Sequence, residues 1–243
     1  MKYAYFCLLF LFCFSCKKIW HKANTHYTPQ MMESHRKLSE DPEVVAMISP
    51  YKTKLDAEMN KVIGQCLVEM PKRKPECVLG NWMADALEEK AEALTGTNID
   101  FAFQNYGGIR IPALSKGPIT TGKIYELMPF DNQLVILEMN GATLRQLILH
   151  IAADNGWPLS RSIKVNIEGE KAMIKIDDEM IQLEQKYKVA MPDYIANGGN
   201  DCFFLMDQKQ EVLDVLIRDV LLEYVEDKKE LNGKLEGRFV IRS

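Results

Sequence analysis

Hydrophobic residues recur at helical spacing in some stretches of the chain and alternate with polar residues in others. Between residues 81 and 94, apolar side chains return every three or four positions and three glutamates fall on the opposite face, which predicts an amphipathic helix. Residues 99–104 and 134–139 are short apolar runs bounded by turn formers, as expected of buried strands. Residues 163–181 alternate around Gly169, which predicts a hairpin.

The other elements follow from capping residues and turn formers. Asp41 and Pro42 are typical of a helix start, and the apolar stripe that follows them runs to Met59 and contains Pro50, a residue that kinks helices. The same patterns predict strands at 61–70, 187–191 and 238–242, a turn or short helix at 119–127, and helices at 143–153 and 211–227. Because the elements lack a regular strand–helix–strand rhythm, we predict an α/β fold with a mixed sheet and helices on its faces, and not a doubly wound sheet.

Length and charge narrow the classes of function. The chain has 243 residues, of which 47% are hydrophobic, and this is enough for one large domain with a sizeable core. Its formal net charge is −4, with acidic and basic residues interspersed along the chain. A nucleic-acid-binding protein needs a basic stripe, so we expect no nucleic acid among the partners.

The first 16 residues differ in character from the rest. Lys2 precedes an apolar run, Tyr3 to Phe14, that has the length of a signal-peptide core and is too short to cross a membrane as a helix. A serine before Cys16 resembles the lipobox of bacterial lipoproteins, which predicts a signal peptide at 1–15 and a lipid on Cys16. Cys13 stands where a lipobox usually has leucine, so secretion without a lipid is an alternative.

These features predict an exported protein. Residues 16–40 form a tether and residues 41–243 one domain, and we expect a periplasm-facing membrane lipoprotein of a Gram-negative bacterium. A buried N-terminal strand is the competing interpretation, but two lysines end the apolar run. In an oxidising compartment, Cys66 and Cys77 flank a short basic turn and are the plausible disulfide pair, while three buried free thiols, Cys202 included, are the alternative.

Three turn-rich loops carry residues suited to bind a ligand. Two of them contain a pair of glycines, which lets a ligand approach the backbone closely. The first loop also has an arginine suited to phosphate or carboxylate, and the other two each place an aromatic ring on a turn. Each feature alone is common in ordinary turns, but together they indicate a slot for a flat ring and an anionic group, in which stacking contributes ~1–3 kcal/mol per base. The candidates are Asn105, Gly107, Gly108, Arg110, Phe130, Tyr194, Asn197, Gly198, Gly199 and Asn200.

Four segments, taken in order, resemble the C-terminal, substrate-binding domain of the 5′-nucleotidase family. The resemblance implies a layered mixed-sheet α/β/β/α domain over roughly residues 43 to 242. It also implies that Phe130 and Tyr194 sandwich the base, that Asn105 is a polar contact, and that Arg110 faces the anionic end of a nucleotide. The segments are Gly80-Asn81…Asp85-Ala86, Asn105…Gly107-Gly108-Ile109-Arg110, Pro129-Phe130 and Tyr187-Lys188-Val189…Ala196-Asn197-Gly198-Gly199.

Two positions depart from the family pattern. Family members often have an aspartate that accepts hydrogen bonds from ribose hydroxyls where this chain has Asn200. An arginine that some members carry late in the helix after Asp85 is missing here. Asn200 can still accept through its carbonyl oxygen, though without charge assistance. With the arginine missing, we expect a weaker grip on the phosphate.

The resemblance also implies that this sequence has the substrate-binding domain of an enzyme without the catalytic domain. In the family, a separate N-terminal metallophosphatase domain binds two metal ions, whereas this sequence has four histidines and no Asp-x-His or Gly-Asn-His pattern. Three of the histidines lie in or beside the tether, and we expect the fourth, His150, to pack on its helix or to be partly exposed. We therefore predict no metal ligand and no catalytic residue in this chain, which should not hydrolyse phosphate esters alone.

The leading hypothesis is the nucleotide-binding half of a split periplasmic 5′-nucleotidase. In it, a separately encoded metallophosphatase chain would hold the divalent metals and dock across the face that carries Arg110, Phe130 and Tyr194. A stand-alone nucleoside-binding lipoprotein and a degenerate structural or interaction module are the alternatives.

Overall fold

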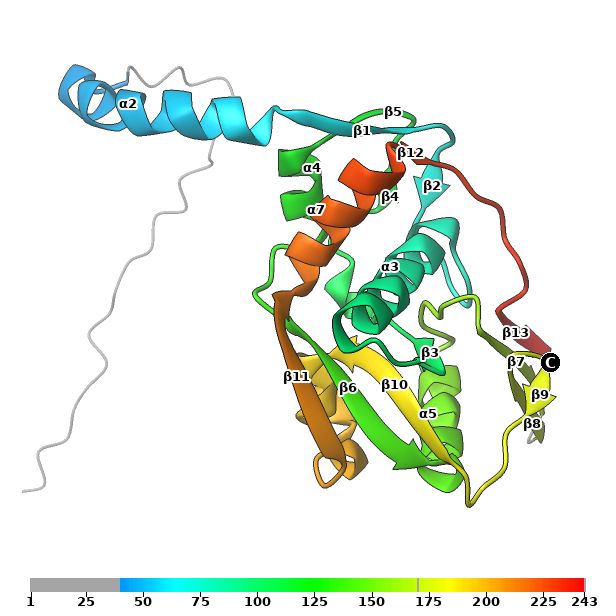
Figure 1. Ribbon diagram of the computed structural model, residues 1–243. Helices are drawn as coiled ribbons and strands as arrows, with labels where there is room; N and C mark the ends of the chain where they lie inside the picture. The colour runs from blue at the N-terminus through cyan, green and yellow to red at the C-terminus, as the bar shows by residue number, and fades with distance from the viewer. Residues whose placement is uncertain (1–39, 170, 243) are drawn as a thin grey trace, which may run out of the picture. The chain divides into compact units, whose positions relative to one another are not determined.

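The computed structural model describes residues 40–169 and 171–242. The predicted signal peptide, Cys16 and all of the predicted tether but its last residue lie outside these ranges. Residues 1–45 and 46–243 form two units, and of the first only residues 40–45 are described. The second unit has a mixed α/β fold, which confirms the predicted class (Figure 1).

A four-stranded mixed sheet separates two hydrophobic clusters. Its order is β11 (Lys209–Leu216), β6 (Gln133–Asn140), β10 (Lys186–Pro192) and β3 (Phe101–Ala102), and β10 is parallel to β3 and antiparallel to β6. Side chains of β6 and β10 enter one cluster at even positions and the other at odd positions. Burial on both faces explains why these strands form continuous apolar runs in the sequence.

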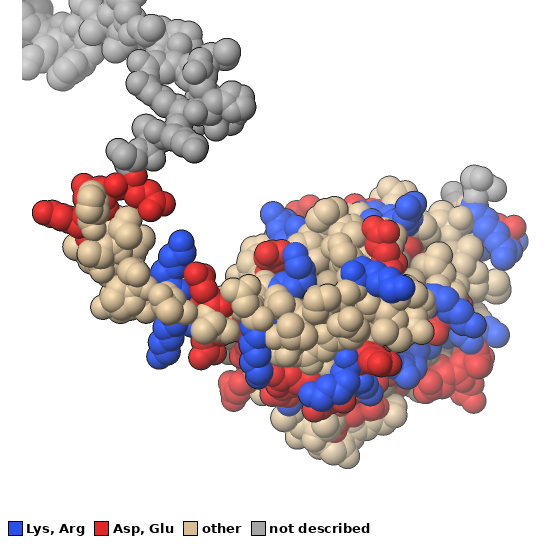
Figure 2. Space-filling view, turned by 90° about the horizontal axis from the view of Figure 1, so that it is seen from above, with Lys and Arg blue, Asp and Glu red and all other residues tan. Residues whose placement is uncertain are grey.

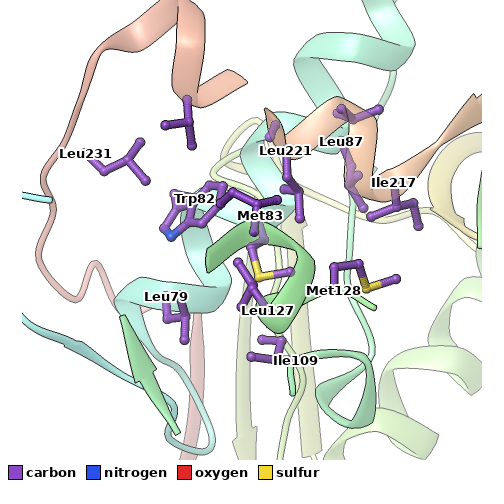
Figure 3. Close-up of a cluster of buried hydrophobic side chains, with 14 of the residues drawn as sticks. Leu79, Trp82, Met83, Leu87, Ile109, Leu127, Met128, Ile217, Leu221 and Leu231 are labelled. Carbon is purple, nitrogen blue, oxygen red and sulfur yellow. The ribbon is translucent and has the colours of Figure 1, made fainter. Parts of the chain in front are cut away.

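The first cluster is covered by α3 (Val78–Thr95), α4 (Thr121–Leu127) and α7 (Ile217–Lys228). Figure 3 shows Ile109 and Met128 pointing into this cluster. Both residues belong to the predicted binding loops or adjoin them, so the loops are anchored in the core.

The second cluster is formed by α5 (Gly141–Ala153) and by a second four-stranded sheet. That sheet contains the predicted hairpin, β7 (Ile163–Glu168) and β8 (Lys171–Ile176), which is flanked by β13 (Phe239–Arg242) and β9 (Glu179–Met180). β13 runs parallel to β7, so the end of the chain completes this sheet.

The strand predicted at 61–70 is two short strands. β1 (Val62–Cys66) lies between β12 (Glu230–Leu231) and β5 (Gly117–Thr120) in a three-stranded sheet. Separately, β2 (Met70–Pro71) pairs with β4 (Ala113–Leu114). The chain changes sheets between β1 and β2, a feature that depends on distant strands and leaves no local pattern.

The predicted helix at 211–227 begins too early. Residues of β11 up to Leu216 pair with β6, and only from Ile217 does the chain turn into α7. The register shifts between Val212 and Leu216, where Asp214 has a φ of 52°. Pairing with the edge of β6 overrides the helical spacing of the apolar residues.

α2 (Pro42–Met59) starts where the sequence predicts. Asp41 Oδ1 accepts a hydrogen bond from the N–H of Glu43 over 2.9 Å, and the helix runs through Pro50 without a break. None of its residues is buried, so its apolar stripe is exposed, Met47, Tyr51 and Leu55 included. Contiguous exposed apolar residues commonly mark an interaction surface.

The Gly80…Ala86 segment carries a buried ion pair that joins α3 to Arg238, the residue directly before β13. The two terminal nitrogens of Arg238 donate to the carboxylate of Asp85 over 2.7 and 3.0 Å, and the N–H of Arg161 donates to it over 2.9 Å. Asp85 and Arg238 are both buried. The structure therefore gives this segment a role in stability.

Cys66, Cys77 and Cys202 are free and buried. Of the two predicted arrangements, the structure therefore has the three free thiols and not the Cys66–Cys77 disulfide. The thiol of Cys77 accepts a hydrogen bond from the N–H of Gly80 and caps α3. Burial raises the pKa of the Cys202 thiol to about 11. Each thiol thus has a packing role.

Acidic and basic side chains are interspersed on the face of the molecule that Figure 2 shows. This surface has no large area of a single sign, as the composition suggests. In the described part of the chain, the helices are all too short or too polar to cross a membrane.

Candidate functional site

Three loops meet at one end of the four-stranded sheet that contains β6, β10 and β3. The first (residues 104–110) follows β3, the second (128–132) precedes β6, and the third (193–201) follows β10. β3 is parallel to β10 and β6 is antiparallel to it, so these strand ends lie together, as the pairing of Leu134 with Pro192 shows. Strand pairing alone therefore brings the predicted binding loops to one place.

The first and second loops are joined directly. The N–H of Arg110 donates to the carbonyl of Leu127 over 2.9 Å, just before the second loop. On either side of this bond, the buried side chains of Ile109 and Met128 anchor the two loops in the first cluster. Arg110 and Phe130 are thus carried by backbone that is fixed.

The third loop is bonded to the other two through side chains. Asn132 Nδ2 donates to Asp193 Oδ1 over 3.0 Å, and Asn105 Nδ2 donates to Asn200 Oδ1 over 3.2 Å. Each pair of loops is therefore held by at least one hydrogen bond, and the site is largely preformed.

A cavity of about 620 Å³ opens among the three loops. Cavities of this size bind small ligands and cofactors. Asp131 and Asn132 line it and are not among the residues predicted from the sequence. The other lining residues are all candidates: Asn105, Gly107, Gly108, Arg110, Phe130, Tyr194 and Asn200.

The remaining candidates, Asn197, Gly198 and Gly199, do not line this cavity. A Cβ at Gly199 would lie 2.6 Å from two ring atoms of Tyr194, so glycine lets the ring pack against the backbone. The structure gives Gly199 a role in shaping the aromatic wall, where the sequence predicted ligand contact.

His150 supports the third loop from α5. Its Nε2 donates to the carbonyl of Asn200 over 2.8 Å, and its ring packs edge-on against Trp157 and Phe204. Asn200 has a φ of 51°, a left-handed conformation that asparagine tolerates better than most residues. No local pattern in the sequence signals this contact, because it joins residues 50 positions apart.

The cation at the site is Arg110, whose Cζ lies 5.6 Å from the centroid of the Phe130 ring. One terminal nitrogen donates to the carbonyl of Gly107 over 3.2 Å. The guanidinium has further N–H groups, which remain available to a ligand anion. The positions of Arg110 and Phe130 at one cavity suit a ligand with a ring next to an anionic group.

A second cation, Lys72, lies beside the first loop. Its Nζ donates to the carbonyl of Ile109 over 2.7 Å and sits 4.0 Å from the centroid of the Tyr106 ring. Burial, and secondly the charge of Arg110, lower the pKa of Lys72. The sequence pattern predicted only a turn for the basic run at 72–74, although its charge was a usable signal.

Arg218 of α7 supports the second loop. Its terminal nitrogens donate to the carbonyl of Phe130 over 3.3 Å and to Asp131 over 2.9 Å, and its guanidinium lies over the ring of Tyr125. Because the helix was predicted to start at 211, the sequence did not indicate that Arg218 lies in the first turn of α7.

Within the described ranges, no group of three or more His, Cys, Asp or Glu side chains is placed so that it could hold a metal ion.

The chain matches the family model described as "5'-nucleotidase, C-terminal domain" over residues 61–207. Mouse 5'-nucleotidase is 25% identical over 234 residues, which cover 83% of this chain and 40% of the mouse protein. The "trifunctional nucleotide phosphoesterase protein YfkN" of Bacillus subtilis is 26% identical over 229 residues, 82% of this chain and 15% of that protein. The chain thus spans less than half of either relative.

The fold is also similar to solved structures. The crystal structure of a 5'-nucleotidase precursor from Thermus thermophilus superimposes with a TM-score of 0.71 at 25% identity, covering 83% of this chain and 43% of that one.

Proposed function

This chain belongs to the C-terminal domain family of 5′-nucleotidases, and from this we propose that its cavity binds the nucleotide substrate of a split 5′-nucleotidase. A separately encoded metallophosphatase chain would hold the metal ions and hydrolyse the phosphate ester. The chain itself contributes binding and orientation of the substrate.

One observation carries this proposal: Phe130, Tyr194 and Arg110 line the same cavity. Two aromatic side chains offer stacking surfaces for a base, and stacking contributes ~1–3 kcal/mol per base. The guanidinium beside Phe130 gives a charge-assisted donor to a phosphate oxygen. Base and phosphate of one nucleotide thus have complementary groups in one cavity.

The proposed partner is supported by the position of the exposed surfaces. Phe130 and Tyr194 are 39% and 48% exposed, so the cavity is accessible to a docking chain. The exposed apolar stripe of α2 extends to Leu55, shortly before the family match begins at residue 61. Both surfaces are ones that a metallophosphatase chain would cover.

The proposed location is the periplasm, with a lipid on Cys16 and the domain at residues 41–243. It rests on the signal-peptide-like run and on the serine before Cys16.

Reconstitution tests the proposal. The full chain is mixed with a metallophosphatase that lacks its own C-terminal domain, and phosphate release from AMP is measured with divalent metal present. We expect the wild-type chain to raise the rate, and Arg110→Ala and Phe130→Ala to abolish the gain. Arg145→Ala, at an exposed position of α5, is the matched control and should behave as wild type.

The outcomes separate the hypotheses. An equal gain from Arg110→Ala, Phe130→Ala and wild type would contradict the assignment of the cavity. AMP binding by the wild-type chain with no gain in hydrolysis would support the stand-alone binding protein instead.

A further inference from the structure

A second cavity, of about 330 Å³, lies apart from the three binding loops. It is enclosed by the first two turns of α3, by the C-terminal end of α7 and by the segment that follows β12. It shares no lining residue with the cavity among the loops. We call residues 232–235 of that segment the strap; they belong to the red stretch between β12 and β13 in Figure 1.

Two polar atoms of residues that line this second cavity lack hydrogen-bond partners. Asn81 Oδ1 and Trp82 Nε1 are both buried without a partner. The two residues are only 4% and 5% exposed. A buried polar group without a hydrogen bond costs its full desolvation penalty, so a ligand that supplied both partners would be favoured.

The chain fixes which kind of partner each atom needs. Asn81 Nδ2 donates to Glu76 Oε1 over 2.8 Å, and a flipped amide would place an oxygen against that carboxylate. The ring of Trp82 stacks on Tyr224 with the centroids 6.0 Å apart, and Figure 3 shows its nitrogen on the side of the ring away from Met83. An indole nitrogen only donates. The cavity therefore has one unused acceptor and one unused donor.

The buried charges of the wall are already paired with one another. Arg238 donates through all three of its nitrogens, to Asp85 over 2.7 and 3.0 Å and to Glu236 over 2.7 and 2.8 Å. Arg161 also pairs with Asp85, over 3.2 Å. A charged ligand would have to compete with these pairs, whereas an uncharged ligand leaves them intact.

The charges at the rim do not favour an ion either. Lys228 pairs with Glu89 over 2.8 Å. The other two charged lining residues, Glu230 and Lys234, are exposed and opposite in sign. The rim thus has no excess of one sign that would select an anion or a cation.

The strap gives a ligand a way in, because it is fixed only at its ends. Before it, β12 pairs with β1; after it, the carboxylate of Glu76 accepts from the N–H groups of Glu236 and Gly237 over 3.0 and 2.9 Å. Between these points, the one hydrogen bond recorded within the described ranges is local, from the N–H of Gly233 to Asn232 Oδ1. The strap can therefore shift without breaking a hydrogen bond to the rest of the domain, and uncover the two buried atoms.

We propose that this cavity is a second binding site, for a small uncharged ligand that carries both a hydrogen-bond acceptor and a donor. The acceptor binds the indole N–H of Trp82, and the donor binds Asn81 Oδ1. Carboxamides and the hydroxyl groups of polyols share this chemistry, whereas a carboxylate only accepts and an ammonium group only donates. The inference does not depend on the proposed function, because the two cavities are separate.

The indole N–H signals in the NMR spectrum of the ¹⁵N-labelled full chain test the proposal. The chain has three tryptophans, and the signal of Trp82 is the one that Trp82→Phe removes. Trp157 is an internal reference, because its Nε1 already donates to Asp154 Oδ2 over 2.6 Å. The probes are acetamide, glycerol, acetate and methylammonium, each titrated separately.

A neutral probe should shift the Trp82 signal saturably and leave that of Trp157 in place. A response to acetamide assigns the carboxamide class, and a response to glycerol assigns the polyol class. Acetate and methylammonium should bind about tenfold more weakly than the neutral probe, because each leaves one of the two buried atoms unpaired.

A matched pair of variants separates the site from the rest of the fold. With the backbone N–H signal of Gly233 in the strap as reporter, Trp82→Phe should abolish the saturable shift. Trp157→Phe, the same change at a buried tryptophan outside this cavity, should keep it.

The wild-type chain decides the question even if neither variant folds. No saturable shift of the Trp82 signal with acetamide or glycerol would overturn the inference and mean that the cavity holds water only. Binding of acetate or methylammonium as tight as that of the neutral probe would also overturn it.

Discussion

The hydroxyl of Tyr194 accepts a hydrogen bond from the backbone N–H of Asn200, 3.3 Å away. The ring packs against Gly199, between the two residues, where a Cβ would collide with it. Tyr194 and Asn200, which both line the cavity, are therefore held to each other. A phenylalanine at 194 would supply the same ring without this bond.

Tyr194 should contribute to AMP binding in two separable parts. Tyr194→Phe keeps the ring and loses one hydrogen bond, so we expect a loss of about twofold to tenfold in affinity, from ~0.5–1.5 kcal/mol. Tyr194→Ala also loses the stacking surface, ~1–3 kcal/mol, or about 5-fold to 150-fold. Calorimetric titration with AMP measures both variants, and wild-type affinity in Tyr194→Ala would refute the stacking role.

His150 should affect binding without touching the ligand. Its Nε2 donates a hydrogen bond to the carbonyl of Asn200 over 2.8 Å, so His150→Leu should weaken AMP binding about twofold to tenfold, the range for one hydrogen bond. His150→Gln restores an N–H donor and should recover part of the loss. If both variants bind AMP equally well, the hydrogen bond plays no part in positioning Asn200.

Breaking the buried ion pair between Asp85 and Arg238 should cost more stability than breaking an exposed ion pair. Asp85→Ala leaves a buried guanidinium without its bidentate partner, and we expect a loss of ~3–5 kcal/mol in the free energy of unfolding. Urea denaturation measures this loss. Lys164→Ala, which breaks an exposed pair with Asp178, is the control and should cost only ~0–1 kcal/mol. Similar costs at the two sites would contradict the structural role assigned to Asp85.

Glu88 should make stability fall as the pH rises. Burial raises the pKa of Glu88, and hydrogen bonds from Ser160 and Ser162 offset this only in part. The folded chain therefore holds the proton more tightly than the unfolded chain, and stability is lost as pH rises from the ordinary glutamate range through the folded pKa.

Glu88→Gln removes this ionisation. The quantity to compare is the free energy of unfolding of the variant minus that of wild type. This difference should be more positive at about pH 7 than at about pH 4, and urea denaturation at the two pH values measures it. The same difference between variant and wild type at both pH values would contradict a raised pKa.

The sequence predicted elements well where local pattern and tertiary packing agree. The amphipathic helix at 81–94 lies within α3 and the alternation at 163–181 forms β7 and β8, because their apolar positions face the two clusters directly. The errors at 61–70 and 211–227 both concern strands whose partners lie far along the chain. Local spacing carries no information about such pairing.

The candidate site shows the same division. The glycines, aromatic residues and Arg110 could be selected from the sequence, because each has an unusual place on a turn. His150 and Arg218 could not, because their importance lies in hydrogen bonds that join α5 and α7 to loop residues 50 and 88 positions away along the chain.

Ligand-induced stabilisation of the full chain by AMP tests the central claim most directly. A ligand that binds only the folded state adds about 2.7 kcal/mol at a concentration 100 times its Kd, so AMP should raise the melting temperature of wild type in a concentration-dependent way. Phe130→Ala should lose most of this shift, whereas Phe203→Ala, an exposed phenylalanine outside the cavity, should keep it. The absence of a shift in wild type at millimolar AMP, or an undiminished shift in Phe130→Ala, would contradict the claim that this cavity binds a nucleotide.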